Sequence, residues 1–284
     1  MSWLLHLERC NTFRGDRFRP LLLGERRVGM VRADNAERLA RFADVFAVSA
    51  DAVRLVARGG FEPVSAAVDG VVERLVADGA VAKWRNENFA VAPVWGEAPL
   101  FKLDRGAVPF FGIRAYGVHV NGWRRGADGV LKLWIGRRAP DKKVEPNKLD
   151  NLVAGGIGYP HGIEDTLVKE AEEEAGMPAS LAARAQPAGY VSYRMEWGAG
   201  ARDDVLYVYD LETPADFTPR NRDGEIAEYT LMDARDVLDR VRDTDDFKFN
   251  VNLVILDFAL RHGVIPPDHP HHEMLRAGLR RPLA

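Results

Sequence analysis

Three glutamates in one short segment are the residues of this chain best suited to chemistry. Glu170, Glu173 and Glu174 stand in the run KEAEEEAGM at 169–177. At about 100° per residue they fall within one sector of roughly 100° around a helix. Apolar positions beside that sector, such as Leu167, would hold it against the rest of the domain. The spacing therefore predicts three carboxylates that converge on the floor of a groove.

This acidic cluster is electrostatically unfavourable unless a cation binds it. Glu170 and Glu174 are like charges four residues apart, which costs roughly a few tenths of a kcal/mol. Gly176 is the expected C-cap, so the cluster extends into the last turn, where the helix dipole is already negative. Hard oxygen ligands with room for water and phosphate suit Mg²⁺, or else Mn²⁺. The alternative is a solvated acidic helix face, which composition alone leaves open.

A glycine-rich loop lies between an expected strand at 149–153 and the expected helix at 163–175. Its glycines are Gly155, Gly156, Gly158 and Gly162. Glycine permits positive φ and close backbone approach, so carbonyls can face a metal and amides can face phosphate. A plain turn is the alternative for the loop taken alone. Strand, loop and acidic helix in direct succession favour a metal-dependent diphosphate site.

The chain here resembles the Nudix box, G-x5-E-x7-R-E-U-x-E-E-x-G-U, in which U is a bulky apolar residue. The matching residues are Gly155, Glu170, Glu173, Glu174, Gly176 and Met177, and Ala171 fills the first U position weakly. His161 stands where the pattern has Glu, and Lys169 where it has Arg. In the family these two positions mainly form a supporting ion pair, so the departures fall on the scaffold of the site.

Wider blocks resemble one Nudix branch, which carries an extra N-terminal domain and includes the Nudix half of fungal thiamine pyrophosphokinases and their plant relatives. The blocks are 117–122, 133–138, 149–156, 160–163 and 221–226, within a resemblance that covers most of 84–268. Pro-His-Gly-Ile at 160–163 is usual in that branch. The resemblance implies Mg²⁺-dependent hydrolysis of thiamine diphosphate, or its oxo and oxy analogues, to the monophosphate.

The same resemblance implies roles for the acidic residues. Glu173 and Glu174, with the backbone carbonyl of Gly155, would hold Mg²⁺. Glu170 would join the metal set and orient or deprotonate the attacking water. Glu225 is the candidate for a further metal-ligating acid, although a turn carboxylate is its simpler interpretation.

Substrate contacts are expected from Gly156, His161 and Tyr193. Tyr193, with Trp197, could stack on a thiamine-like or base ring, although aromatic residues in strands more often serve packing.

Strand and helix patterns outside the box predict two domains. Residues 1–110 form a smaller α/β accessory domain, 111–270 form a Nudix α/β/α sandwich with a mixed sheet, and 271–284 form a mobile tail. The boundary is placed in the stretch 96–109, which contains Pro99 and Gly106. The accessory domain could cover the substrate ring or form a homodimer interface.

Composition excludes several kinds of partner. The net charge of −3 gives no reason to expect binding to nucleic acid or to an anionic membrane. Cys10 is the only cysteine, which excludes internal disulfides and fits a cytoplasmic location. The segment 1–9 lacks the features of a signal peptide, and no apolar run reaches the roughly 18 residues of a membrane span. We therefore expect a small diphosphate substrate that is recognised locally.

Other functions stay open at this point. The nearest is a Nudix hydrolase of ADP-ribose or of a dinucleotide cofactor, because the box specifies diphosphate chemistry and not the ring. A non-catalytic diphosphate-binding regulatory module would follow if His161 and Lys169 disabled the site. Isomerase chemistry on a related fold is a weaker alternative.

Overall fold

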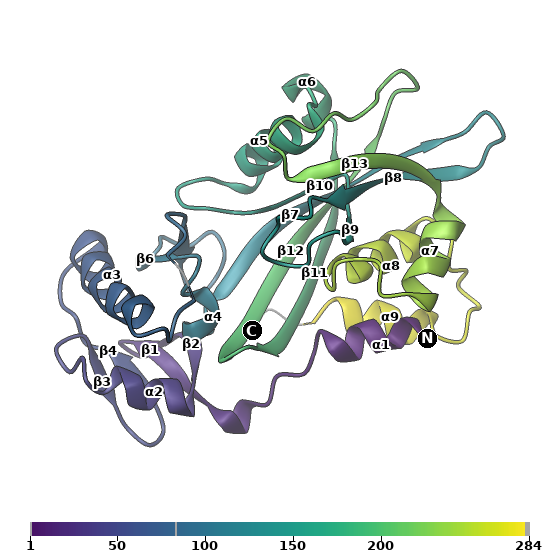
Figure 1. Ribbon diagram of the computed structural model, residues 1–284. Helices are drawn as coiled ribbons and strands as arrows, with labels where there is room; N and C mark the ends of the chain where they lie inside the picture. Colours follow the sequence, from purple (N-terminus) through teal and green to yellow (C-terminus); the bar gives the residue numbers. More distant parts are fainter. Residues whose placement is uncertain (1, 83, 282–284) are drawn as a thin grey trace.

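The chain folds into two lobes, each built on one main sheet with its own apolar core (Figure 1). The computed structural model describes residues 2–82 and 84–281. The N-terminal lobe contains a four-stranded sheet in the order β2-β1-β4-β3 and a separate β5–β6 hairpin. Its elements are η1 (Gly15–Arg17), β1 (Phe18–Leu23), β2 (Arg26–Arg32), α2 (Ala33–Leu39), β3 (Phe46–Val48), β4 (Val53–Leu55), α3 (Phe61–Ala77), β5 (Asn88–Val91), β6 (Phe101–Asp104) and α4 (Val108–Phe111).

The seven-stranded sheet of the second lobe is mixed, as predicted. Strand β12 runs parallel to β7, and the other pairs are antiparallel. The strands are β7 (Arg114–Arg125), β8 (Leu131–Arg138), β9 (Leu149–Asp150), β10 (Val153–Gly156), β11 (Gln186–Trp197), β12 (Gly200–Glu212) and β13 (Ile226–Asp233). Helices α5 (Ile163–Ala175) and α6 (Ala179–Ala182) lie on one side, and α7 (Ala234–Asp243) and α8 (Val251–Arg261) lie on the other (Figure 1). The predicted α/β/α sandwich is confirmed.

The two ends of the chain pack together, which corrects two predicted boundaries. Helix α1 (Trp3–Arg9) lies beside α9 (His272–Leu279), far from the N-terminal sheet (Figure 1). Leu275 and Leu279 are buried in the same core as Trp3 and Leu7. Each pair is spaced four residues apart, so each helix buries one apolar stripe. Residues 3–10 thus belong to the second lobe, and the prediction of a mobile tail from 271 is wrong for the described residues.

The stretch expected to separate the domains is structured. It contains β6 and the start of α4, and the N-terminal core continues through Phe111 to Ile113. Pro99 therefore lies in the loop between β5 and β6 and Gly106 in the turn after β6, both inside the first lobe and not in a linker. No helix in the described chain is long and apolar enough to cross a membrane.

Candidate active site

Helix α5 is fixed at both ends by the residues that flank it. Asp165 Oδ2 accepts a hydrogen bond from Gly162 N at 3.4 Å, and Thr166 Oγ1 donates to Gly162 O at 2.8 Å. Gly176 ends the helix with φ of 60°, and a Cβ there would lie 2.7 Å from the carbonyl oxygen of Arg220. Leu167 and other apolar residues of α5 pack on the sheet. The acidic side of the helix is consequently held beside strand β10.

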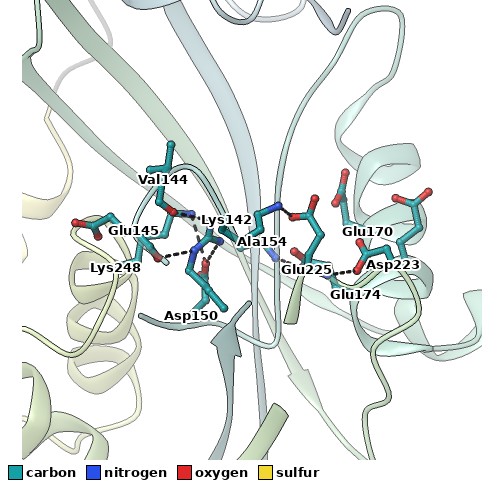
Figure 2. Close-up of polar contacts among 12 residues, drawn as sticks. Lys142, Val144, Glu145, Asp150, Ala154, Glu170, Glu174, Asp223, Glu225 and Lys248 are labelled. Carbon is teal, nitrogen blue, oxygen red and sulfur yellow. Dashed lines mark hydrogen bonds and ion pairs between the residues drawn. The ribbon is translucent and has the colours of Figure 1, made fainter. Parts of the chain in front are cut away.

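Glu174 is a buried carboxylate, with 3% of the residue exposed. Its Oε2 accepts a hydrogen bond from Ala154 N at 2.8 Å (Figure 2). The Tyr229 hydroxyl donates a hydrogen bond to the backbone oxygen of Glu174 at 3.0 Å. Burial raises the pKa of Glu174 well above its ordinary value, and the negative charge of Asp150 raises it further. No lysine, arginine or histidine of the described residues forms an ion pair with this carboxylate.

Glu170 packs directly against Gly155. A Cβ at position 155 would lie 2.4 Å from both Cγ and Cδ of Glu170, so a larger residue would displace this carboxylate. Burial raises the pKa of Glu170, although the charge of Lys169, 3.3 Å away, opposes the effect. Glycine at 155 therefore lets the carboxylate approach the backbone of β10.

Glu173 does not join the other two glutamates. Its carboxylate is exposed and lies 2.6 Å from Lys169 Nζ. No group of three His, Cys, Asp or Glu side chains in the described chain is close enough to hold a metal ion. The prediction that three carboxylates converge is wrong as stated, because Glu170 and Glu174 line β10 whereas Glu173 pairs with a lysine on its own helix.

Glu225 follows a turn that lies near α5. Asp223 Oδ1 accepts a hydrogen bond from Glu225 N at 2.8 Å, and the Glu225 carboxylate pairs with Lys142 (Figure 2). Its charge contributes to the raised pKa of Glu170 and of Glu174. Glu225 is thus near enough to act electrostatically on both acids, and its metal role stays a prediction.

A second buried acid, Asp150 of β9, lies on the side of the site toward α8 and was not predicted (Figure 2). Its carboxylate is 2.9 Å from Arg138 Nη1 and 3.4 Å from Lys248 Nζ. Burial favours a raised pKa, but Lys248, His119 and Arg138 together lower the pKa of Asp150. Lys248 stands 98 positions away in the chain, so no local spacing could have indicated this group.

The expected conformation of the glycine loop also needs correction. None of the four glycines is among those with positive φ. Gly155 and Gly156 lie in β10. Glycine is required there because other side chains approach the backbone closely, and not because φ is positive. A Cβ at Gly156 would lie 2.9 Å from Phe89 Cζ of the N-terminal lobe, so that side of Gly156 is covered by protein.

The predicted ring contact by Tyr193 is wrong. Tyr193 is 1% exposed, lies in the core on the α8 side of the sheet, and donates its hydroxyl hydrogen bond at 2.5 Å to Asp204 Oδ2. Trp197 packs near Phe249 on that side. His161, by contrast, is exposed and lines a cavity of about 230 Å³. Its role in substrate binding stays a prediction.

Buried acids beside a glycine-containing strand, on an α/β/α sandwich that carries the box, define a pyrophosphohydrolase of the Nudix type. A NUDIX domain model matches residues 115–251, and a domain of unknown function (DUF4743) matches residues 2–115. The chain belongs to the Nudix hydrolase family, whose members act on nucleoside diphosphate derivatives and generally use divalent metals such as Mg²⁺.

Two relatives from Arabidopsis thaliana match most of the chain. Nudix hydrolase 20, chloroplastic, is 39% identical over 278 residues, covering 92% of this chain and 73% of the relative. Nudix hydrolase 24, chloroplastic, is 39% identical over 288 residues, covering 98% and 78%. Among solved structures, DR0079 from Deinococcus radiodurans aligns with a TM-score of 0.45 and 22% identity, over 60% of this chain and 97% of that one.

Proposed function

We propose that this Nudix hydrolase cleaves thiamine diphosphate, or its oxo and oxy analogues, in a Mg²⁺-dependent reaction. Water adds to one phosphorus of the diphosphate, the bridging P–O bond breaks, and the products are the monophosphate and orthophosphate. The observation that carries the proposal is the pair of acids Glu170 and Glu174, both packed on β10 and both with raised pKa values.

The residues of the site fit a hard divalent cation. Glu170 is partly buried and Glu174 is fully buried, and burial raises the pKa of both carboxyl groups. A cation bound nearby would lower these pKa values again. All the candidate donors are oxygens, as Mg²⁺ and Mn²⁺ prefer. Glu170, Glu174 and the Gly155 carbonyl would hold the ion, with Glu225 as a further ligand, and Glu173 would join them only by leaving its ion pair with Lys169. Once bound, the cation would neutralise charge on the diphosphate.

The protein side chains have separate tasks in this proposal. Glu170, held against Gly155, is placed to orient or deprotonate the attacking water. Ala154 N fixes one oxygen of Glu174, which leaves the other available as a ligand. Lys169 and Lys142 each hold one outer carboxylate, Glu173 and Glu225 respectively. These lysines keep two further acids close to the site without burying them.

The choice of thiamine diphosphate is supported by the sequence blocks that resemble one Nudix branch, including Pro-His-Gly-Ile at 160–163. In the structure this segment leads from β10 into α5 and includes cis-Pro160. His161, in the segment between β10 and α5, is one of the residues that line the cavity of about 230 Å³.

A substrate panel tests the proposal. Thiamine diphosphate, oxythiamine diphosphate, ADP-ribose and NADH are each incubated with Mg²⁺ or with chelator, and phosphate-containing products are separated by chromatography. We expect turnover of the thiamine compounds with Mg²⁺ alone. Glu174→Gln should lower kcat at least about a hundredfold, on the order of losing one preorganised electrostatic contact at the reacting group.

The panel separates the alternatives. A preference for ADP-ribose would keep the diphosphate chemistry and reject the thiamine substrate. Turnover of none of the four, with binding retained, would indicate a diphosphate-binding regulatory module. Full activity of Glu174→Gln, with an unchanged circular dichroism spectrum, would reject the metal assignment.

A further inference from the structure

We propose that the N-terminal lobe supplies one wall of the substrate-ring pocket, and that Trp95 in this wall selects a planar heteroaromatic ring that carries positive charge. This inference rests on the proposed function for the diphosphate chemistry. It adds a role for the DUF4743 domain, which lies outside the Nudix box. The pocket is the cavity of about 230 Å³ that His161 lines.

The cavity lies between the two lobes. One wall comes from β5 and the segment that follows it and includes Phe89, Trp95 and Pro99. The other comes from Tyr116 and residues 157–161. Gly155, which touches Glu170, is two residues from Ile157 at the cavity wall. Two residues of chain span at most about 7 Å. A ring in the cavity can therefore carry a diphosphate that reaches the acids of α5.

The wall from the N-terminal lobe is fixed to the catalytic lobe. Tyr159 N donates a hydrogen bond to Asn88 O at 2.7 Å, and the Tyr159 ring lies 5.2 Å from that of Phe61 in α3. Phe89 occupies the space that a side chain at Gly156 would need. Strand β5 is thereby held against β10 and the segment that follows it. The two walls of the cavity are therefore fixed relative to each other in the folded chain.

The lining chemistry favours a flat cation. The Trp95 ring is half-buried and lies 4.6 Å from Tyr116 and 5.6 Å from Tyr207, so three aromatic rings form one cluster beside the cavity. Two charged residues of the lining are already in ion pairs, Arg114 with Asp203 and Glu97 with Arg26. The aromatic faces remain as the attractive surface, and tryptophan binds cations best among the aromatic side chains.

The size of the cavity favours one small ring system. Pockets for drug-sized ligands occupy about 300–1,000 Å³, and this cavity of about 230 Å³ lies below that range. It is too small for both halves of a dinucleotide. The thiazolium ring of thiamine or of oxythiamine combines the required size, planarity and charge.

Thiamine, which has no phosphate and needs no metal to bind, is the direct probe. Calorimetry compares wild type with Trp95→Leu, Trp95→Phe and the control Trp197→Leu, in which a half-buried tryptophan outside the pocket is changed. We expect Trp95→Leu to weaken thiamine binding about tenfold and Trp95→Phe about threefold, in the order of their cation–π strength. Trp197→Leu should bind like wild type, and the neutral ring of adenosine should bind more weakly than thiamine.

Kinetics distinguish failure of this inference from failure of the proposed function. In Trp95→Leu we expect KM for thiamine diphosphate to rise about tenfold, whereas the control Trp197→Leu should keep the KM and kcat of wild type. Wild type that hydrolyses thiamine diphosphate while both Trp95 variants keep its KM would overturn the pocket and leave the function standing. Wild type that binds thiamine through Trp95 but hydrolyses no diphosphate would overturn the function and leave the pocket standing. Equal binding of adenosine and thiamine would overturn the charge preference.

Discussion

Asp150 and Glu174 are neighbouring buried acids whose surroundings differ in one respect. Asp150 lies beside Arg138 and Lys248, and these cations lower its pKa in spite of burial. Glu174 forms no ion pair with a described side chain, and burial raises its pKa. Asp150 lies in β9, and Glu174 is hydrogen bonded to Ala154 of β10 (Figure 2). The chain thus neutralises Asp150 with its own cations, whereas in the function proposed above a bound metal ion neutralises Glu174.

The largest expected effect concerns folding stability. Asp150→Asn leaves Arg138 and Lys248 buried without their counter-charge, so we expect the free energy of unfolding to fall by about 3–5 kcal/mol. Glu174→Gln removes a buried negative charge and keeps an acceptor for Ala154 N. In chelator it should be at least as stable as wild type. Urea unfolding monitored by fluorescence measures both variants.

The contrast between these two variants is the informative result. Equal losses of stability would mean that Glu174 is already paired in the folded protein, and the comparison would fail. A stable Asp150→Asn variant would show that Arg138 and Lys248 find other partners or solvent.

The next effect tests how closely Glu170 must lie to the backbone of β10. In Gly155→Ala the new methyl group would occupy the position of the Glu170 carboxylate, and a displacement of about 1 Å can cost on the order of a hundredfold in rate. Gly162→Ala is the matched control, because its Cβ would meet no atom closer than 3.7 Å and this glycine does not line the cavity. We expect a large fall in kcat for the first variant and little change for the second, measured at saturating Mg²⁺.

If both alanine variants kept full activity, Glu170 would be too far from the reaction to orient water. If both lost activity equally, the loop as a whole and not the contact with Glu170 would be required.

The same comparison shows what the sequence could predict. The acidic segment was predicted as a helix at 163–175 and is observed as Ile163–Ala175, because apolar spacing and Gly176 are local signals. The mixed sheet followed from strand patterns of the same local kind. The pairing of Asp150 with Lys248 could not be predicted, since the fold alone brings these distant positions together. Local spacing also could not show that Glu173 would turn toward Lys169.

The positions of Tyr193 and Trp95 also differ from what the sequence predicted. Tyr193 was assigned to a ring contact because aromatic residues suit stacking, but strand alternation places it in the core on the α8 side. Trp95 was overlooked because nothing near it in the sequence resembles a site. Trp95 lines the cavity only because β5 lies against the segment that follows β10. Composite sites of this kind require the tertiary structure.

The smallest effect is the pH dependence of stability. The folded-state pKa of Glu174 is raised above its ordinary value of 4.5, so in chelator its contribution is fully favourable below that pH. This contribution is lost as pH rises through the folded pKa, with a slope of at most about 1.4 kcal/mol per pH unit. Asp150 behaves oppositely, because its lowered pKa gives stability that disappears only as pH falls below its ordinary range.

Thermal unfolding between about pH 5 and about pH 8.5 distinguishes the contributions of the two acids to stability. In chelator, wild type should lose stability relative to Glu174→Gln as pH rises, because the unfolded wild-type chain releases the Glu174 proton at a lower pH than the folded protein does. Mg²⁺ should reverse the trend, since metal ligation requires the deprotonated acid. Parallel curves for the two proteins in chelator would mean that Glu174 ionises without cost, and a cation from outside would then have no buried charge to neutralise.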